Sequence, residues 1–84
     1  MLWHSHWTPK GTFRLQIESR HGAAVISLYC DETFLGIFFS AATLARSLAT
    51  DEFEATLGFK TSTLGIPADT NEWTTRLDID MSGL

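Results

Sequence analysis

The sequence contains few of the residues that hold small secreted domains together. Its 84 residues include one cysteine, Cys30, and only two prolines. A single cysteine cannot form an internal disulfide bond, so the chain is not a disulfide-stabilised scaffold and a reducing compartment is the simplest expectation. The length accommodates one domain and excludes a multi-domain enzyme.

Long apolar segments are also missing. The longest run without a charged residue covers residues 33–45, and these 13 residues are too few for a membrane-spanning helix, which needs about 20. The first residues do not show the basic region followed by an apolar stretch that marks a secretory signal. We therefore expect a soluble, cytoplasmic protein that does not contact a membrane.

Basic residues are scarce, and the charges are unevenly distributed. Six Lys and Arg stand against ten Asp and Glu, which gives a formal net charge of -4. Residues 1–30 carry a net charge of +2, and residues 31–84 carry -6. An acidic surface disfavours nucleic acid, so the sequence predicts a protein partner with a basic surface.

The first half of the sequence shows the patterns of short strands followed by a helix. Residues 12–19 alternate apolar and polar side chains, and residues 23–30 are rich in β-forming residues, so both segments are predicted strands. Residues 33–39 are apolar on both sides, which predicts a central strand covered on both faces. Gly36 within it predicts either a bulge or the close approach of another backbone. Residues 41–48 place apolar side chains at helical spacing and predict a helix.

The second half of the sequence adds two predicted strands. Residues 51–60 fit either a strand or a short helix, and their Phe and Thr content favours a strand. Residues 73–81 alternate and predict a final strand. The predicted fold class is α+β, a single antiparallel sheet in the order β-β-β-α-β-β with one helix packed on one face. Within one domain, residues 1–11 form an arm or an extra hairpin strand, and residues 82–84 a frayed tail.

One helix can cover only one face of such a sheet. The N-terminal arm, closure of the sheet into a barrel, or another molecule must then cover the other face. Trp3 and Trp7 lie on one side of the arm if the arm is extended. They form either a lid over the sheet or exposed anchors at an interface, where Trp is enriched.

No motif identifies an enzymatic chemistry. His4, His6, His21 and Cys30 are of the residue types that bind zinc, but their spacing matches no standard zinc-finger pattern. Cys30 ends an apolar strand, and nothing beside it marks an oxyanion hole. We therefore predict no catalytic residue, no metal site and no cofactor. The predicted partner contacts are Trp and acidic residues, namely Trp3, Trp7, Asp51, Glu52, Glu54, Asp78 and Asp80.

In size, acidity, lack of catalytic motifs and α+β pattern, the chain resembles the small inhibitors encoded by phages and mobile elements, such as anti-CRISPR proteins. The resemblance concerns these bulk properties, so no residue roles are transferred. It implies a non-enzymatic inhibitor that binds stoichiometrically to a nucleic-acid-handling defence complex in a bacterial cytoplasm. The alternatives are a self-associating accessory phage protein such as a homodimer, a toxin-immunity protein, and an OB-like binder of single-stranded nucleic acid.

Overall fold

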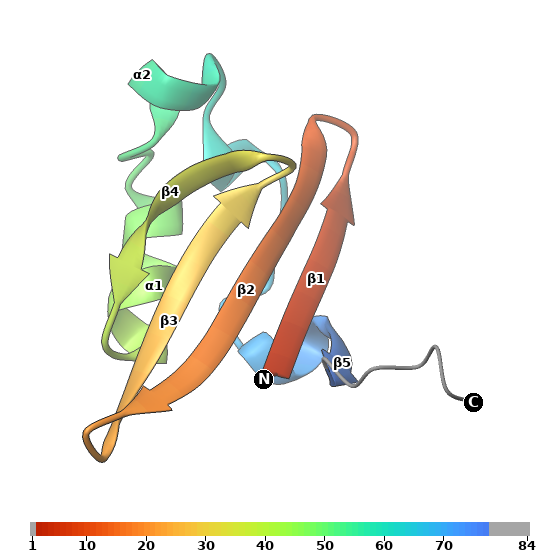
Figure 1. The fold of residues 1–84 in the computed structure, drawn as a ribbon. Coiled ribbons are helices and arrows are strands. Elements are labelled where there is room, and N and C mark those ends of the chain that lie inside the picture. Colours follow the sequence, from red (N-terminus) through yellow and green to blue (C-terminus); the bar gives the residue numbers. More distant parts are fainter. Residues whose placement is uncertain (1, 78–84) are drawn as a thin grey trace.

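Four consecutive strands pair as an antiparallel meander and form most of the sheet. The computed structural model describes residues 2–77, in which a fifth strand pairs antiparallel with the first. The strand order is β4-β3-β2-β1-β5, so the sheet is open and has β4 and β5 as its edges (Figure 1). The strands are β1 (Leu2–Thr8), β2 (Gly11–Arg20), β3 (Ala23–Cys30), β4 (Thr33–Phe38) and β5 (Thr74–Leu77).

Short turns join the strands of the meander and set their register. His21 and Gly22 between β2 and β3 both have positive φ angles, 53° and 80°, as a type I′ hairpin turn requires. Between β3 and β4, Asp31 has a φ of 51° and accepts a 2.9 Å hydrogen bond at Oδ1 from the Thr12 backbone N–H. These turns keep the alternating apolar residues of neighbouring strands on one side of the sheet.

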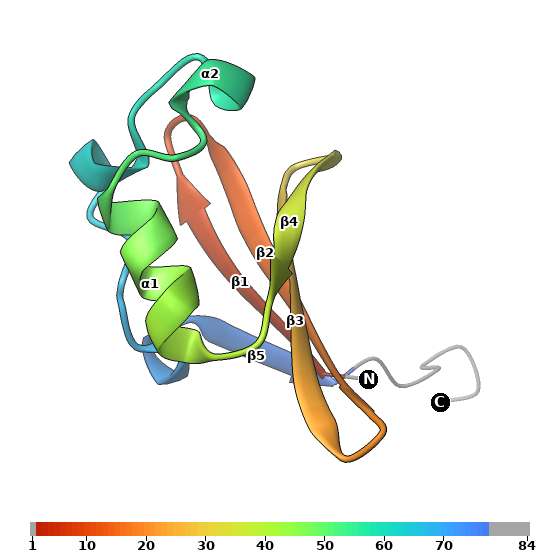
Figure 2. The same cartoon turned by 90° about the vertical axis from the view of Figure 1, so that its left-hand side faces the viewer.

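Helix α1 (Ala41–Ala49) packs against one face of the sheet, which we call the inner face (Figure 2). Ser40 caps the helix by accepting a 3.2 Å hydrogen bond from the Thr43 N–H. Leu44 and Leu48, one turn apart, are both buried against the strands. The core between the two layers consists of Phe13, Leu15, Ile26, Leu28, Cys30, Phe38, Leu44, Leu48, Phe53 and Trp73.

The segment after α1 returns to the sheet through short helical turns. These are α2 (Glu54–Leu57) and the 3-10 turns η1 (Thr61–Thr63) and η2 (Thr70–Glu72). Trp73 is buried beside β5, and its indole Nε1–H donates a 2.9 Å hydrogen bond to the Pro67 carbonyl. Within residues 2–77, no helix has the length and apolar character needed to cross a membrane.

The element order differs from the predicted β-β-β-α-β-β. Residues 1–11 contain the strand β1, and the predicted strand over residues 51–60 is wrong because this segment contains α2. Gly58 ends α2 in the left-handed conformation at φ 82°, and its N–H bonds to the Glu54 carbonyl. The predicted last strand is confirmed over Thr74–Leu77. Trp73 precedes this strand as the C-cap of η2, and residues 78–81 lie outside the described residues.

The prediction that residues 33–39 form a central, doubly covered strand is also wrong. Among the described strands, β4 has only β3 as a neighbour, and Phe34 and Ile37 are exposed on the face opposite the core. The bulge expected at Gly36 is confirmed, since the β3–β4 register shifts there and places an extra residue, Leu35, on β4. β4 therefore carries apolar side chains on both faces, although only those on the inner face, such as Phe38, are buried.

Candidate binding surface

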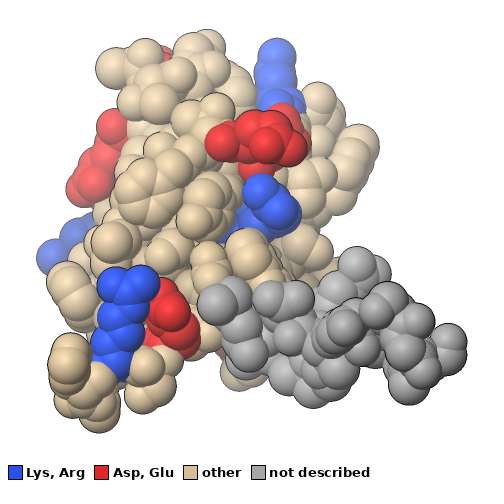
Figure 3. All heavy atoms as spheres, viewed as in Figure 1, with Lys and Arg blue, Asp and Glu red and all other residues tan. Residues whose placement is uncertain are grey.

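The face of the sheet opposite α1, which we call the open face, carries no layer of described residues (Figure 2). Arg14 lies between Phe13 and Leu15, which are fully buried on the inner face, so its side chain points to the open face. The same alternation places Trp3 and Tyr29 on this face. Figure 3 shows the face directly, with mostly uncharged atoms over β2, β3 and β4.

Four side chains from four neighbouring strands form a continuous row across the open face, which we call the aromatic row: Trp3, Arg14, Tyr29 and Phe34. The ring centroids of Trp3 and Tyr29 are 6.2 Å apart, and those of Tyr29 and Phe34 are 5.4 Å apart. The guanidinium carbon of Arg14 lies 5.5 Å from the ring centroids of both Trp3 and Tyr29. These distances are typical of aromatic pairs and cation–π contacts.

Arg14 is held in the aromatic row by a backbone contact. Its Nη2 donates a 2.9 Å hydrogen bond to the carbonyl oxygen of Asp31. No carboxylate among residues 2–77 lies within ion-pair distance of Arg14, since the ion pair found there joins Arg20 to Glu18. The row therefore presents an ordered cation between aromatic rings, and no described carboxylate forms an ion pair with it.

Exposed apolar side chains are concentrated on the open face and along β4. Among the described residues, the large hydrophobic side chains that are exposed are those of Trp7 (71% exposed), Phe34 (52%), Ile37 (48%) and Phe39 (73%). Single exposed apolar residues are ordinary, but a contiguous patch of them marks an interaction site. The open face thus combines an ordered row with exposed apolar surface beside it.

The two predicted tryptophan contacts lie on the open face, but they do not form a separate lid over the sheet. Both belong to β1, where Trp3 pairs with Gln16 and Trp7 pairs with Thr12. Trp3 is half-buried within the aromatic row, whereas Trp7 is exposed near the β1–β2 turn. Their role in contacting a partner stays a prediction.

Among the predicted acidic contacts, the three that the structure describes follow α1 and do not share the open face with the tryptophans. Asp51 accepts 2.9 Å hydrogen bonds from the N–H and the hydroxyl of Ser62, which hold the pKa of its carboxyl below the usual value. This carboxylate ties the end of α1 to η1. Glu52 lies just before α2 and Glu54 is the first residue of α2, and both are exposed. Asp78 and Asp80 lie outside the described residues.

The candidate zinc ligands are not brought together. His4 is buried on the inner face, and His6 lies beside the Trp73 ring with centroids 5.8 Å apart. His21 is exposed in the turn before β3, whereas Cys30 ends that eight-residue strand. No three His, Cys, Asp or Glu residues in the described part of the chain are placed to hold a metal ion.

Cys30 has the surroundings of a structural residue. It is buried in the core. Burial, and next the charge of Asp31, raise the pKa of its thiol, which disfavours the reactive thiolate.

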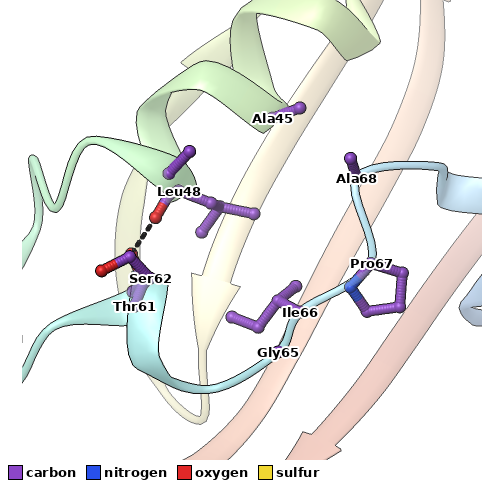
Figure 4. A pocket seen from close by; sticks show the side chains of 9 residues that line it. Ala45, Leu48, Thr61, Ser62, Gly65, Ile66, Pro67 and Ala68 are labelled. Carbon is purple, nitrogen blue, oxygen red and sulfur yellow. Dashed lines mark hydrogen bonds between the residues drawn. The ribbon is translucent and has the colours of Figure 1, made fainter.

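A cavity of about 160 Å³ lies between α1 and the loop of residues 61–68 (Figure 4). Cofactor and substrate pockets usually measure about 300–1,000 Å³, so this one is too small for a cofactor. It contains no titratable side chain, and the Thr61 hydroxyl beside it donates to the Leu48 carbonyl. Its lining residues are Ala45, Leu48, Ala49, Thr61, Ser62, Gly65, Ile66, Pro67 and Ala68.

Comparison with protein-family models, with curated proteins and with solved structures gives no match for this chain. The arguments for a function therefore rest on its own residues. Of the surfaces described above, the open face has the largest set of side chains suited to binding another molecule.

Proposed function

We propose that this protein is a non-enzymatic binding module whose open face docks on a protein partner. The observation that carries the proposal is the aromatic row together with the exposed Trp7. Trp, Tyr and Arg are the residue types most enriched among the side chains that contribute most to protein–protein affinity. Because mutual contacts already order the row, its side chains would lose little conformational freedom on binding.

The partner proposed for this face has a basic surface beside the area that the face contacts, where the acidic residues outside the open face can act on it. The chain carries a net charge of -4, and Glu32, Glu52 and Glu54 are exposed. Such charges steer the approach of a basic partner, while the apolar contacts maintain the complex. A protein that handles nucleic acid has such a basic surface. We therefore propose stoichiometric inhibition of a bacterial nucleic-acid-handling defence complex, in the host cytoplasm.

A reconstituted inhibition assay tests this proposal. The protein is titrated into a purified CRISPR effector complex, and binding of target DNA by the complex is measured. We expect inhibition to saturate at one equivalent, and Trp7→Thr combined with Phe34→Thr to abolish it. The matched control is Ala42→Ser on the exposed side of α1, which should inhibit like the wild type. A double variant that inhibits as well as the wild type contradicts docking through the open face.

The acidic residues are tested separately from the aromatic ones. Reversing Glu52 and Glu54 to Lys should slow association and reduce its dependence on salt, with little change in dissociation, because charges outside a contact act mainly on encounter. Association rates that are unchanged by the reversals, and unchanged by 0.5 M salt, contradict the steering role while leaving the aromatic contact standing.

A second candidate function is the binding of single-stranded nucleic acid. The specific observation is an arginine set between aromatic rings on a face of the sheet that no other layer of described residues covers, since bases stack on such surfaces. The open sheet gives no support to the OB-like barrel form of this idea. Titrating single-stranded oligonucleotides against tryptophan fluorescence separates the candidates. Quenching that weakens with salt favours nucleic acid, and an unchanged signal at high micromolar oligonucleotide favours a protein partner.

A further inference from the structure

The edge of the sheet formed by β4 presents unpaired backbone groups. β4 has β3 as its neighbour on one side, and β5 lies at the opposite edge of the sheet. Beyond the β3–β4 pairing, no hydrogen bond among the described residues involves residues 33–38. Figure 2 looks toward this edge, and no described element lies across it. N–H and C=O groups that point away from β3 are therefore available to another strand.

This edge lacks charged residues that would discourage pairing. Residues 33–39 contain no charged residue and no proline, whereas Lys, Pro and short strand length commonly protect exposed edges. The opposite edge of the sheet, β5, has the protective features that β4 lacks, because it is only four residues long and includes Arg76. Three of the four exposed large hydrophobics also lie in this stretch: Phe34, Ile37 and Phe39. The bulge at Leu35 leaves residues 36–38 as the regular part of the edge.

We infer that β4 pairs antiparallel with β4 of a second copy of this chain, which joins two sheets into one across a two-fold axis. This inference does not depend on the proposed function. An uncharged edge meets its own copy without like-charge repulsion, and a two-fold contact closes on itself. The contact leaves the aromatic row available on each copy.

The charges at the two ends of β4 favour the antiparallel arrangement. Asp31 and Glu32 precede the strand, and α1 begins at Ala41, soon after it, with no acidic residue in its first turn. Antiparallel pairing places the acidic end of one copy beside the helix start of the other, where the helix dipole is positive. Parallel pairing would instead place the acidic ends side by side.

Sedimentation or light scattering over a concentration series tests this inference. One strand pair makes a small interface, so we expect a monomer–dimer equilibrium with a dissociation constant of about 10 µM to 1 mM. Ile37→Lys should weaken the dimer at least about tenfold, because two like charges then meet at the edge. Trp7→Lys makes the same change on a strand inside the sheet and should leave the dimer unaltered. Circular dichroism verifies that both variants are folded.

Backbone amide exchange gives a second measurement that needs no substitution. Amides of residues 33–38 should gain protection as the wild-type concentration rises, while those of β5 should not. A chain that is monomeric at 1 mM, equal weakening by Ile37→Lys and Trp7→Lys, or open-ended association in place of a dimer would each overturn the inference.

Discussion

The two faces of the sheet should respond very differently to substitution, and Leu28 and Trp7 test this difference. Leu28 is fully buried at the centre of the inner face, whereas Trp7 is 71% exposed on the open face. Replacing a buried Leu by Ala removes about 2–5 kcal/mol of folding free energy. A chain of this length has roughly 4–13 kcal/mol in total, at about 0.05–0.15 kcal/mol per residue. Leu28→Ala should therefore cost about 3 kcal/mol, a large share of the total.

Trp7→Thr should cost less than about 1 kcal/mol, because most of the indole is already in water and threonine suits a strand equally well. The assay is urea unfolding followed by far-UV circular dichroism. With a slope of about 1 kcal/mol per M, Leu28→Ala should lower the midpoint by about 3 M. Ile26→Val, at about 1 kcal/mol, supplies a milder core variant if Leu28→Ala does not fold. Equal losses for Trp7→Thr and Leu28→Ala would refute the assignment of the two faces.

Three further substitutions test individual contacts. The lowered pKa of Asp51 contributes stability above its unfolded value of about 4, and this contribution is lost as the pH falls through the folded value. The difference in urea midpoint between wild type and Asp51→Asn should therefore be fully present at pH 7 and should shrink as the pH falls below about 4; a difference that stays constant down to low pH would contradict the role of the Ser62 contacts. Gly11→Ala should lower the free energy of unfolding by at least about 1 kcal/mol more than Gly22→Ala does. Both glycines have positive φ, but only at Gly11 would a Cβ come within 2.8 Å of a carboxylate oxygen; equal losses in thermal melts would contradict this. Arg14→Met should cost about 1–2 kcal/mol in urea unfolding, since it removes two cation–π contacts and a hydrogen bond, and a loss near zero would show that the aromatic row is not ordered by the guanidinium.

Sequence patterns predicted those parts of the fold that depend on neighbouring residues. The alternation in residues 12–19 and the helical spacing in residues 41–48 both match elements of the structure. The strand predicted for residues 51–60 was wrong because Phe53 and Leu57 fit both a strand and a helix pattern. A spacing of four residues places two side chains on the same face of a strand and also one turn apart on a helix. In the structure, Gly58 ends a helix in the left-handed conformation. This conformation depends on the direction of the following segment, which the local sequence does not specify.

The position of β4 in the sheet could not be predicted from its composition. A strand that is apolar on both faces usually lies in the middle of a covered sheet, but the same pattern arises when an edge strand is exposed to other molecules. Local sequence does not distinguish these cases, because strand order is set by contacts between distant residues. The register shift at Gly36, in contrast, was predictable, since a glycine inside a strand commonly marks a bulge.

The candidate surface was predictable only in part. Trp3 and Trp7 are recognisable because two tryptophans near one another in a small domain are unusual. Arg14 and Tyr29 were not among the predicted protein-partner contacts, although alternation with their buried neighbours would have placed both on the open face. Their meeting with Trp3 requires the register of three strands, which pairs Arg14 with Tyr29 and Trp3 with Gln16. No single segment contains that information.

The fold itself does not require apolar side chains at Trp7, Phe34 and Ile37. Threonine favours a strand as well as these residues do, and side chains that are half or more exposed contribute little burial in the monomer. Exposed apolar strands also promote unwanted association. The inner face and α1 already form the core. In the isolated chain, these exposed side chains therefore increase the tendency to associate and add little to the free energy of unfolding. The contacts proposed above, on the open face or along the β4 edge, would give these side chains a role.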